Sequence, residues 1–319
     1  LLKSSLLPGR IPISRAKHLP QRSLFGVLPV VQVPYRNDES IDWNTLKKEV
    51  DFLFDHGVNG LVTGMVSEVQ RLTESERDKL TENLVRFSAD RGPVIASVGG
   101  ESIAQMLRHA KAAETAGADG LMAIPPATTR CSDSEILNYY RALVRNTTKP
   151  VIVQDASGYL GNPIPIHTQV RLFSEFPTRI MFKPEAQPIG TSLSLIRDGT
   201  KGKAALFEGT GGIALVDTYQ RGITGTMPGA EIPWAMVALW RALENGDFEK
   251  ARIIHAPIAA MVSMMHCLDA FIAIEKLLLK EQGIFKNTMV RGPVAFFPDP
   301  ETKAEVLRIF VRLKQICGP

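Results

Sequence analysis

Short apolar runs alternate with amphipathic segments along most of this chain, and this alternation limits the possible folds more than any other feature. Each run has the length and the bulky residues of a strand buried on both faces, and each is bounded by glycine, proline or polar residues. The predicted strands cover residues 26–33, 60–64, 93–98, 120–124, 150–154, 180–182, 204–207 and 222–227. A helix is predicted after each strand, so the sequence predicts an α/β fold with a parallel sheet.

Three of the predicted helix-to-strand joints share one glycine spacing, found as Gly57-x-x-Gly60, Gly117-x-x-Gly120 and Gly222-x-x-Gly225. The first glycine lets the chain leave a helix in the left-handed conformation and re-enter the sheet tightly. A doubly wound sheet is the alternative fold. It would be expected to carry G-x-G-x-x-G after an early strand and an acid further on, and neither is present. We therefore predict a (β/α)8 TIM barrel with additional C-terminal helices.

The barrel is predicted to lie between two further segments of the chain. We expect an irregular basic N-terminal leader, the catalytic barrel and a C-terminal helical extension, at residues 1–25, 26–245 and 246–319. Six basic residues precede the first acid, Asp38, so a transit-peptide remnant and a basic arm are alternatives for the leader. Pro8, Pro12 and Pro20 favour an irregular leader because they would interrupt a long helix.

Composition and charge argue against several functional classes. The net charge is only +4 over 319 residues and no basic cluster carries interleaved aromatic residues, so nucleic-acid binding is not expected. The longest apolar region, residues 254–279, is interrupted by charged residues and predicts two packed helices, with no membrane span. The three cysteines are far apart, which predicts a reducing compartment, the cytoplasm. His56, His109 and His167 fall within predicted helices, so no metal site is expected.

Lys183 ends the predicted strand at residues 180–182 and is followed by Pro184, which stops strand pairing. In a barrel this places the amine at the carboxyl end of a strand, where the chemistry of such folds is found. An apolar rim solvates an ammonium ion poorly. Desolvation favours the neutral amine, a nucleophile that can form a Schiff base with a carbonyl group. The alternatives are an ion pair with Glu185 and a side chain that extends from the strand end into solvent.

Backbone groups after two other strands are candidates for binding a ligand. The N–H groups of Val66 and Ser67, near the start of the next helix, could hold a carboxylate. Gly209, after the seventh strand, permits a ligand to approach the backbone closely, although an ordinary turn glycine is an equal alternative.

In their order and spacing, these segments resemble the dihydrodipicolinate synthase and N-acetylneuraminate lyase family. The resemblance extends over about residues 26–315, and no single motif decides it. It rests on the run 57–68, the joint 116–120 with Pro125, the strand that begins at Pro150, Lys183 with Glu185-Ala186, and the strand 222–227. The resemblance implies an eight-stranded barrel and a class I aldolase mechanism, in which pyruvate or a related 2-keto acid is bound as an imine to Lys183 without another cofactor. It also implies a homodimer or homotetramer.

The chain also departs from the family pattern, which identifies it as a divergent member. Gly64-Met65-Val66-Ser67-Glu68 stands where the family usually has Gly-Thr-Thr-Gly-Glu, so both threonine hydroxyls are missing. Gln154 replaces a tyrosine that handles proton transfer, and an amide cannot act as an acid or base near neutral pH. The tyrosine of the loop after the fourth strand falls at about Ala127, and Tyr159 replaces an expected arginine. Proton transfer then falls to Tyr159, Glu208 or a substrate carboxylate, unless aldol chemistry has been lost.

The predicted function is that of a class I lyase acting on a 2-keto acid. A sugar-acid aldolase or dehydratase is favoured over a dihydrodipicolinate synthase-like enzyme, because the hydroxyls are lost. The expected catalytic residues are Lys183, Gln154 and Tyr159. The expected substrate-binding residues are Met65, Val66, Ser67, Arg130, Glu208, Gly209 and Thr226. The alternative is a non-catalytic 2-keto-acid binding or regulatory protein on the same barrel. A metal-dependent aldolase is a third hypothesis, but it would need histidine and carboxylate ligands on the rim.

Overall fold

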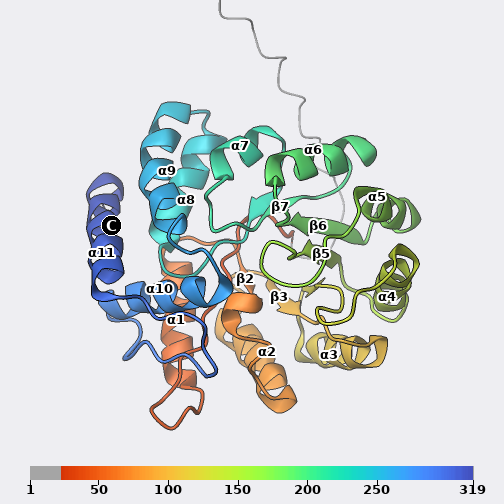
Figure 1. Cartoon of the computed structure of the whole chain (residues 1–319), viewed down its shortest axis with the longest axis horizontal. Helices are drawn as coiled ribbons and strands as arrows, with labels where there is room; N and C mark the ends of the chain where they lie inside the picture. The colour runs from red at the N-terminus through yellow and green to blue at the C-terminus, as the bar shows by residue number, and fades with distance from the viewer. Residues whose placement is uncertain (1–22, 319) are drawn as a thin grey trace, which may run out of the picture.

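The computed structural model describes residues 23–318, and in that range the alternation closes into a ring of strands surrounded by helices (Figure 1). The strands are β1 (Gly26–Val27), β2 (Leu61–Val62), β3 (Val94–Ser97), β4 (Gly120–Ala123), β5 (Val151–Asp155), β6 (Ile180–Pro184), β7 (Phe207–Glu208) and β8 (Gly225–Thr226). The helices of the ring are α1 (Trp43–Asp55), α2 (Glu74–Ser88), α3 (Ile103–Ala116), α4 (Asp133–Arg145), α5 (Ile166–Glu175), α6 (Ile189–Gly199), α7 (Leu215–Gln220) and α8 (Pro233–Glu244). The predicted (β/α)8 barrel is confirmed. The leader predicted for residues 1–25 lies outside the described residues, except for its last three.

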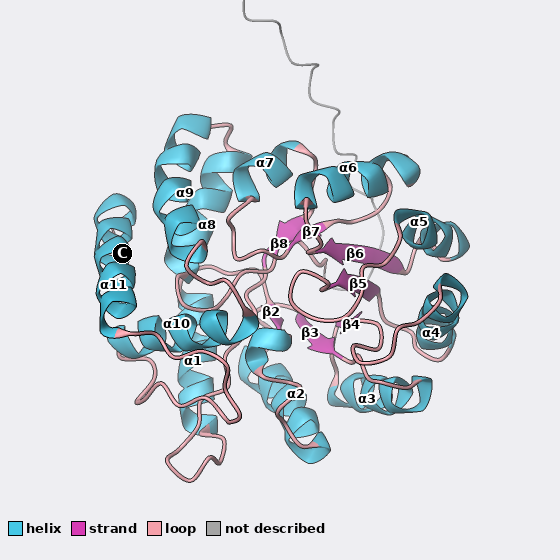
Figure 2. Ribbon diagram, viewed as in Figure 1, coloured by secondary structure: helices cyan, strands magenta, loops and turns pink. Residues whose placement is uncertain are grey.

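Parallel pairing of neighbouring strands builds the ring. One ladder joins β2 to β6 in chain order, and a second joins β1, β8 and β7. Isolated parallel bridges between Val30 and Val62 and between Phe182 and Leu206 connect the two ladders, so the sheet closes on itself. Figure 2 shows the strands at the centre with the helices around them. Closure brings the carboxyl ends of the strands to one face of the molecule, and this fixes where a site can be built.

Two apolar layers stabilise the ring. Inward-pointing side chains such as Leu28, Ile95 and Ile152 fill the barrel and are fully buried. Outward-pointing side chains pack beneath the helices, as Phe182 of β6 does against Phe173 of α5, with ring centroids 6.4 Å apart. Since successive side chains of a strand alternate between the two layers, a polar residue at an inward position near a strand end is directed toward the mouth of the barrel.

The local signals for helix ends are largely confirmed. Thr73 and Glu76 form the predicted capping box at the start of α2. Ser132 caps α4 by accepting a hydrogen bond from the Glu135 amide, but no return bond from the Glu135 side chain completes a second box. The first glycine of each predicted joint has a left-handed backbone, with φ of +82°, +92° and +89° at Gly57, Gly117 and Gly222.

Several elements have other bounds than the sequence predicts; β1, for example, covers Gly26–Val27 and not residues 26–33. The helix expected at residues 193–196 extends over all of α6, since Leu193 and Ile196 are fully buried and stabilise a helix whose flanks hold glycine, serine and threonine. The strand expected at 204–207 lies instead at Phe207–Glu208, and Leu206 forms only an isolated bridge with Phe182.

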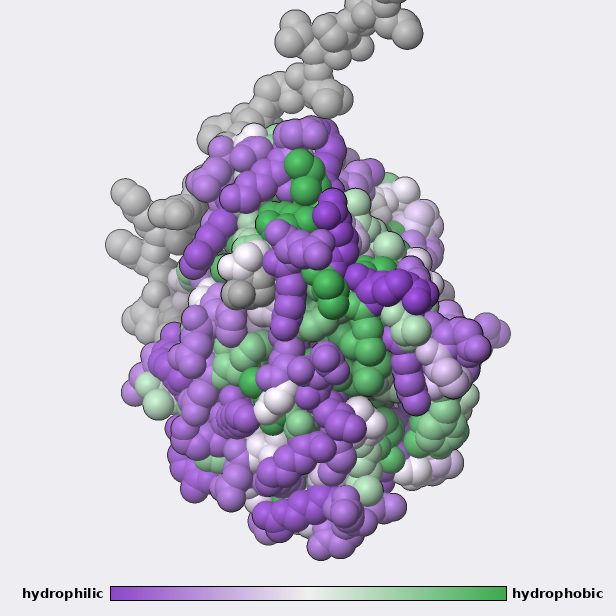
Figure 3. Space-filling model, turned by 90° about the vertical axis from the view of Figure 1, so that its left-hand side faces the viewer, coloured by the Kyte–Doolittle hydropathy of each residue, from purple (hydrophilic) through white to green (hydrophobic). Residues whose placement is uncertain are grey.

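The C-terminal part of the chain forms α9 (Phe248–Val262), α10 (Leu268–Glu281) and α11 (Pro300–Cys317), so the two helices expected between residues 254 and 279 are confirmed. Figure 3 shows the side of the molecule that carries α9 and α11, where apolar side chains gather in a band between hydrophilic ones. Ile253 of α9 and Val311 of α11 are about half exposed. Within residues 23–318, none of the helices has the length and apolar character to cross a membrane.

A buried ion pair fixes α10 against the turn that follows β2. This turn contains the 3-10 helix η1 (Met65–Ser67) and ends at Glu68. Lys276 of α10 donates to Glu68 Oε1 at 2.5 Å, and both side chains are fully buried. Lys276 Nζ also donates to the Met289 carbonyl and lies 4.6 Å from the centre of the Tyr35 ring. Breaking a buried pair by removing one partner costs about 3–5 kcal/mol, so this contact holds α10 firmly over the barrel.

Candidate active site

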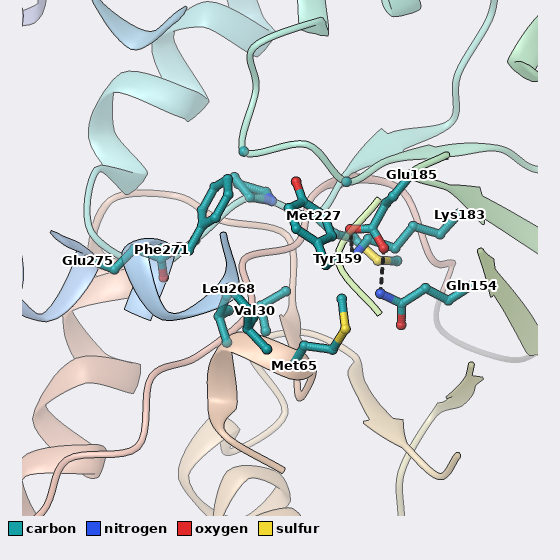
Figure 4. A pocket seen from close by; sticks show the side chains of 15 residues that line it. Val30, Met65, Gln154, Tyr159, Lys183, Glu185, Met227, Leu268, Phe271 and Glu275 are labelled. Atoms are coloured by element: carbon teal, nitrogen blue, oxygen red, sulfur yellow. Dashed lines mark hydrogen bonds and ion pairs between the residues drawn. The ribbon is translucent and has the colours of Figure 1, made fainter. Parts of the chain in front are cut away.

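A pocket opens at the carboxyl ends of the strands and spans about 420 Å³, including the part that is open to solvent. Figure 4 shows the side chains that line it. They come from β5 and β6, from the segments that follow β1, β2, β5, β6, β7 and β8, and from α10. Most of the wall is apolar, so the chemistry of the pocket depends on its few charged and amide groups: Gln154, Lys183, Glu185 and Glu275.

Lys183 lies where the sequence predicts, near the end of β6 and in the pocket wall. Its register partner on β5 is Gln154, so the two side chains are neighbours. The lysine side chain is only 4% exposed. Gly209 makes room for it, because a Cβ at this position would lie 2.2 Å from Lys183 Cε and 3.0 Å from Nζ. A larger residue at position 209 is therefore incompatible with this lysine conformation.

Glu185 connects the lysine to the amide. Its Oε1 atom lies 3.1 Å from Lys183 Nζ, and its Oε2 atom accepts a 2.6 Å hydrogen bond from Gln154 Nε2. Burial raises the pKa of Glu185 above the usual glutamate range, and Lys183 and Gln154 offset part of that rise. The ion pair that the sequence offers as the alternative to a nucleophilic lysine is thus present, but it lies inside the pocket. It places an acid–base group next to the amine.

Tyr159 also lines the pocket, from the loop after β5. Its ring packs edge-on against Phe271 of α10, with ring centroids 5.6 Å apart. Burial and the nearby carboxylates of Glu185 and Glu208 raise the pKa of Tyr159. The phenol therefore stays protonated at neutral pH, so it can donate a hydrogen bond but is a poor base.

Glu208 and Thr226 lie behind the pocket wall, which corrects the prediction that they bind substrate. Glu208 Oε2 accepts a 2.6 Å hydrogen bond from the Thr226 hydroxyl, and Oε1 accepts bonds from the amide and the hydroxyl of Thr210. Both Glu208 and Thr226 are fully buried, and neither lines the pocket. Since both oxygens of Glu208 are engaged, its structural role is to hold the loop that begins at Gly209.

Of the three residues predicted to bind substrate in the segment after β2, Met65 and Val66 line the pocket wall and Ser67 does not. The Ser67 hydroxyl donates to the Val31 carbonyl at 2.5 Å and accepts from the Gly64 amide at 3.1 Å. The Ser67 amide donates to the Gly64 carbonyl at 3.0 Å. The predicted pair of donors, Val66 and Ser67, is therefore corrected. Within the turn at residues 64–67, the amides of Met65 and Val66 are the ones that donate to no acceptor among the described residues.

Arg130, the predicted second anchor for a carboxylate, lies outside the pocket wall. It is exposed, and its Nε atom donates to Asn162 Oδ1 at 3.4 Å. The direction of the loop after β4 decides this position, and the sequence gives no signal for it. In the part of the chain that the structure describes, no arginine or histidine lines the pocket.

Helix α10 supplies a wall that sequence reasoning misses. Leu268, Phe271 and Glu275 line the pocket from this helix, and Figure 4 shows them away from Lys183, toward the other end of the pocket. Their spacing of three and four residues places them on one face of the helix. This spacing is the available signal, but it gains meaning only when the extension is known to pack over the mouth of the barrel.

Buried carboxyl groups surround Glu275. Gln32 Nε2 donates to Glu275 Oε2 at 2.5 Å, and the Gln32 amide donates to Glu49 Oε1 at 2.7 Å. Glu49 is fully buried, and its Oε2 atom has no partner in the described residues. Burial raises the pKa of Glu49 to about 8, although the Gln32 amide and the charge of Lys276 oppose the rise. Glu49 is therefore largely protonated near pH 7 in the folded protein.

We expect the free energy of unfolding to fall as the pH rises from about 5 to 8, and Glu49→Gln to remove part of that fall. The folded protein keeps the Glu49 proton until about pH 8, whereas the unfolded chain releases it near 4.5. The folded state thus binds more protons in this window, so raising the pH favours unfolding, by up to about 1.4 kcal/mol per pH unit for one group. Urea unfolding across this pH range measures the slope. The exposed variant Glu249→Gln should keep the wild-type slope, and an equal slope for Glu49→Gln would contradict the prediction.

The chain is similar in sequence and in fold to known proteins. Residues 23–310 match the sequence profile of the Dihydrodipicolinate synthetase family. L-2-keto-3-deoxyarabonate dehydratase of Azospirillum brasilense is 28% identical over 293 residues, which cover 90% of this chain and 94% of the relative. 4-Hydroxy-tetrahydrodipicolinate synthase of Parabacteroides distasonis is 26% identical over 270 residues, which cover 84% and 90%. The crystal structure of YagE, a prophage protein of the dihydrodipicolinic acid synthase family from Escherichia coli K12 in complex with pyruvate, matches with a TM-score of 0.83 at 23% identity, covering 91% of this chain and 98% of that one.

Proposed function

The chain belongs to the Dihydrodipicolinate synthetase family and is a lyase, and from that premise we propose that Lys183 forms an imine with the carbonyl carbon of a 2-keto acid. The observation that carries the proposal is the Lys183–Glu185 pair, buried in the pocket wall with Nζ and Oε1 3.1 Å apart. An amine attacks only in its neutral form, and Glu185 is placed to accept the proton that the ammonium must lose. The imine itself then serves as the electron sink, so the proposal requires no further cofactor.

Glu185 is placed for the later proton transfers as well. When the amine adds to the carbonyl carbon, the carbonyl oxygen takes up protons and leaves as water. Loss of a proton from the carbon next to the imine then gives an enamine. Expulsion of the hydroxyl group on the following carbon, as water, completes a dehydration. Aldol cleavage starts from the imine instead: that hydroxyl group loses its proton, the carbon–carbon bond breaks, and the imine accepts the electron pair of the bond to become the enamine. A carboxyl group whose pKa is raised by burial can both give and take protons closer to neutral pH.

Gln154 and Tyr159 fit roles in orientation. Gln154 donates to Glu185 Oε2 and so fixes the direction in which the carboxylate faces. Tyr159 stays protonated and can donate a hydrogen bond to a bound substrate. We therefore assign the proton-carrying role that the sequence suggests for Tyr159 to Glu185 instead.

The backbone amides of Met65 and Val66 are our candidates for holding the carboxylate of the 2-keto acid. Both residues line the pocket, and their N–H groups have no protein acceptor among the described residues. Successive backbone donors can bind an anion without a cationic side chain. This matters here because, within residues 23–318, no arginine lines the pocket.

Dehydration of a 2-keto-3-deoxy sugar acid is the reaction that we favour, with aldol cleavage of the same substrate class as the second candidate. The amide of Gln154 stands beside Lys183, where the family pattern has a tyrosine, and the missing threonine hydroxyls argue against dihydrodipicolinate synthesis. Similarity to L-2-keto-3-deoxyarabonate dehydratase over 94% of that relative supports the same choice.

The assembly and the location of the protein stay predictions. A homodimer or homotetramer in the cytoplasm is expected from the sequence. One solved structure of the same fold, at a TM-score of 0.82 and 20% identity, is described as a monomeric dihydrodipicolinate synthase variant.

Borohydride reduction in the presence of pyruvate tests the proposal. It should convert the imine to a stable secondary amine on Lys183, which peptide mass spectrometry locates. Lys276 is an internal control, because it is also fully buried but is paired with Glu68 outside the pocket wall, and it should remain unmodified. An adduct on Lys276 would contradict the proposal. The absence of any adduct, with pyruvate and with a longer 2-keto acid, would favour a protein that binds keto acids without covalent chemistry.

A further inference from the structure

The end of the pocket away from Lys183 is formed by Gly229, after β8, and by Glu275 of α10. Figure 4 shows Glu275 separated from Lys183 and Gln154 by the side chains in the middle of the pocket. A substrate joined to Lys183 at its second carbon would extend its tail from that point through the remaining space. The groups at the far end therefore decide which tails are accepted.

Two carboxyl groups meet at Gly229. A Cβ at this glycine would lie 2.5 Å from Glu275 Oε1 and 2.3 Å from Glu231 Oε2, so both oxygens occupy the space that a side chain would fill. Glu231 is 4% exposed and its Oε2 atom has no hydrogen-bond partner in the described residues. Glu275 is 1% exposed, and its Oε1 atom is likewise engaged by no protein donor there, while Oε2 accepts from Gln32. The acid pair, Glu231 and Glu275, thus presents unpaired oxygens beside a pocket-lining glycine.

The surroundings of the acid pair favour a bound proton. Burial raises the pKa of Glu275 well above the usual range, and Glu231 and Glu49 raise it further whenever they are ionised. Burial also raises the pKa of Glu231, to about 7. Lys276, the neighbouring cation, is paired with Glu68 and only partly opposes these effects. Two neighbouring buried carboxyl groups do not readily ionise together, so we expect a neutral carboxylic acid to face the pocket near pH 7.

We propose that Glu275, supported by Glu231, donates a hydrogen bond to a hydroxyl group on the substrate tail and makes the enzyme select 2-keto acids with an uncharged, hydroxylated tail. This inference rests on the proposed function and deepens it, because it names the substrate class by the chemistry of the end remote from the imine. A protonated carboxyl both donates and accepts, which suits a hydroxyl group.

The charges of the pocket wall exclude the competing class of substrate. Within the described residues, Lys183 is the sole cation of the wall, against the carboxyl groups of Glu185 and Glu275. A second carboxylate on the tail would meet Glu275 without a cation to neutralise it. Burying an ionised carboxylate without a cation costs far more free energy than burying a hydroxyl group, so the pocket wall disfavours such a tail even though Glu275 itself keeps its proton.

Two substrates of equal length test the proposal. 2-Keto-3-deoxypentonate and 4-hydroxy-2-oxoglutarate both carry a hydroxyl at C4, and they differ only at C5, which is a CH₂OH group in the first and a carboxylate in the second. We expect the wild-type kcat/KM for the pentonate to exceed that for the dicarboxylate by about tenfold or more. Glu275→Leu should lower kcat/KM for the pentonate by about 10–100-fold, and by more than it slows borohydride trapping of pyruvate, which has no tail. In Glu275→Gln the side-chain amide can also donate a hydrogen bond, so kcat/KM for the pentonate should fall several-fold less than in Glu275→Leu.

The control is Glu281→Leu, an exposed glutamate at the end of the same helix, which should retain the wild-type preference. Equal use of the two substrates by the wild type would overturn the inference, and so would parallel losses on the pentonate and on pyruvate trapping in Glu275→Leu. If the wild type forms no pyruvate adduct at all, both the proposed function and this inference fail. If the wild type forms the pyruvate adduct but Glu275→Leu keeps the wild-type preference between the two substrates, this inference fails and the proposed function stands.

Discussion

Methionine in place of Lys183 should lower kcat for the 2-keto acid substrate by roughly 10⁴-fold or more, as expected when the nucleophile of a covalent mechanism is removed. Within residues 23–318 no second amine lines the pocket, so no other group can form the imine. Methionine has a flexible, unbranched side chain and fits the space that Gly209 leaves beside position 183. Turnover and the borohydride adduct, measured on the same sample, should disappear together.

The control for this variant is Lys203→Met, which removes an exposed lysine after α6 and should keep both activities. Loss of the cation leaves Glu185 buried without its ion pair, but that carboxyl group can take up a proton and become neutral. We therefore expect a folded variant, which thermal unfolding checks. Turnover within tenfold of the wild type would show that Lys183 is not the nucleophile.

The barrel could be predicted from the sequence because its signals are local. Apolar runs, cap residues and the glycines at positions 57, 117 and 222 each depend on a few neighbouring residues, and the structure confirms them. The helix around Leu193 could not be bounded in the same way, because it is stabilised by burial of side chains such as Leu193 and Ile196 instead of by the propensity of its flanking residues.

The site could be predicted only in part. Lys183 was accessible to sequence reasoning, since a lysine at the end of an apolar strand is unusual, and the same strand gives a signal for Glu185. Residues two apart in an extended chain point to the same side, so positions 183 and 185 both face the pocket. Glu275 could not be placed, because α10 reaches the pocket through contacts such as Lys276 with Glu68, which are 208 residues apart in the chain. The direction of a loop likewise decides that Arg130 lies outside the pocket.

Glu185→Gln should lower kcat by about 10²–10⁴-fold, the contribution typical of a positioned acid–base group. Glutamine keeps an oxygen that can accept the hydrogen bond from Gln154 Nε2, but it can neither take the proton from Lys183 nor return one. In the wild type, kcat/KM should fall on the acidic side as Glu185 takes up a proton. Since burial raises the pKa of Glu185, this fall should lie above the usual glutamate range. The Glu185→Gln variant should not show this fall of kcat/KM on the acidic side.

Tyr159→Phe separates Glu185 from the other candidate for proton transfer. The phenol of Tyr159 is held in its protonated form by burial and by nearby carboxylates, so its removal should cost a hydrogen bond to the substrate and lower kcat/KM by about tenfold or less. Glu249→Gln, an exposed change of the same kind as Glu185→Gln, should leave the pH profile unchanged. If Tyr159→Phe caused the larger loss and removed the acidic limb, the phenol would be the proton carrier. The carboxyl group beside Lys183 would then serve only to balance its charge.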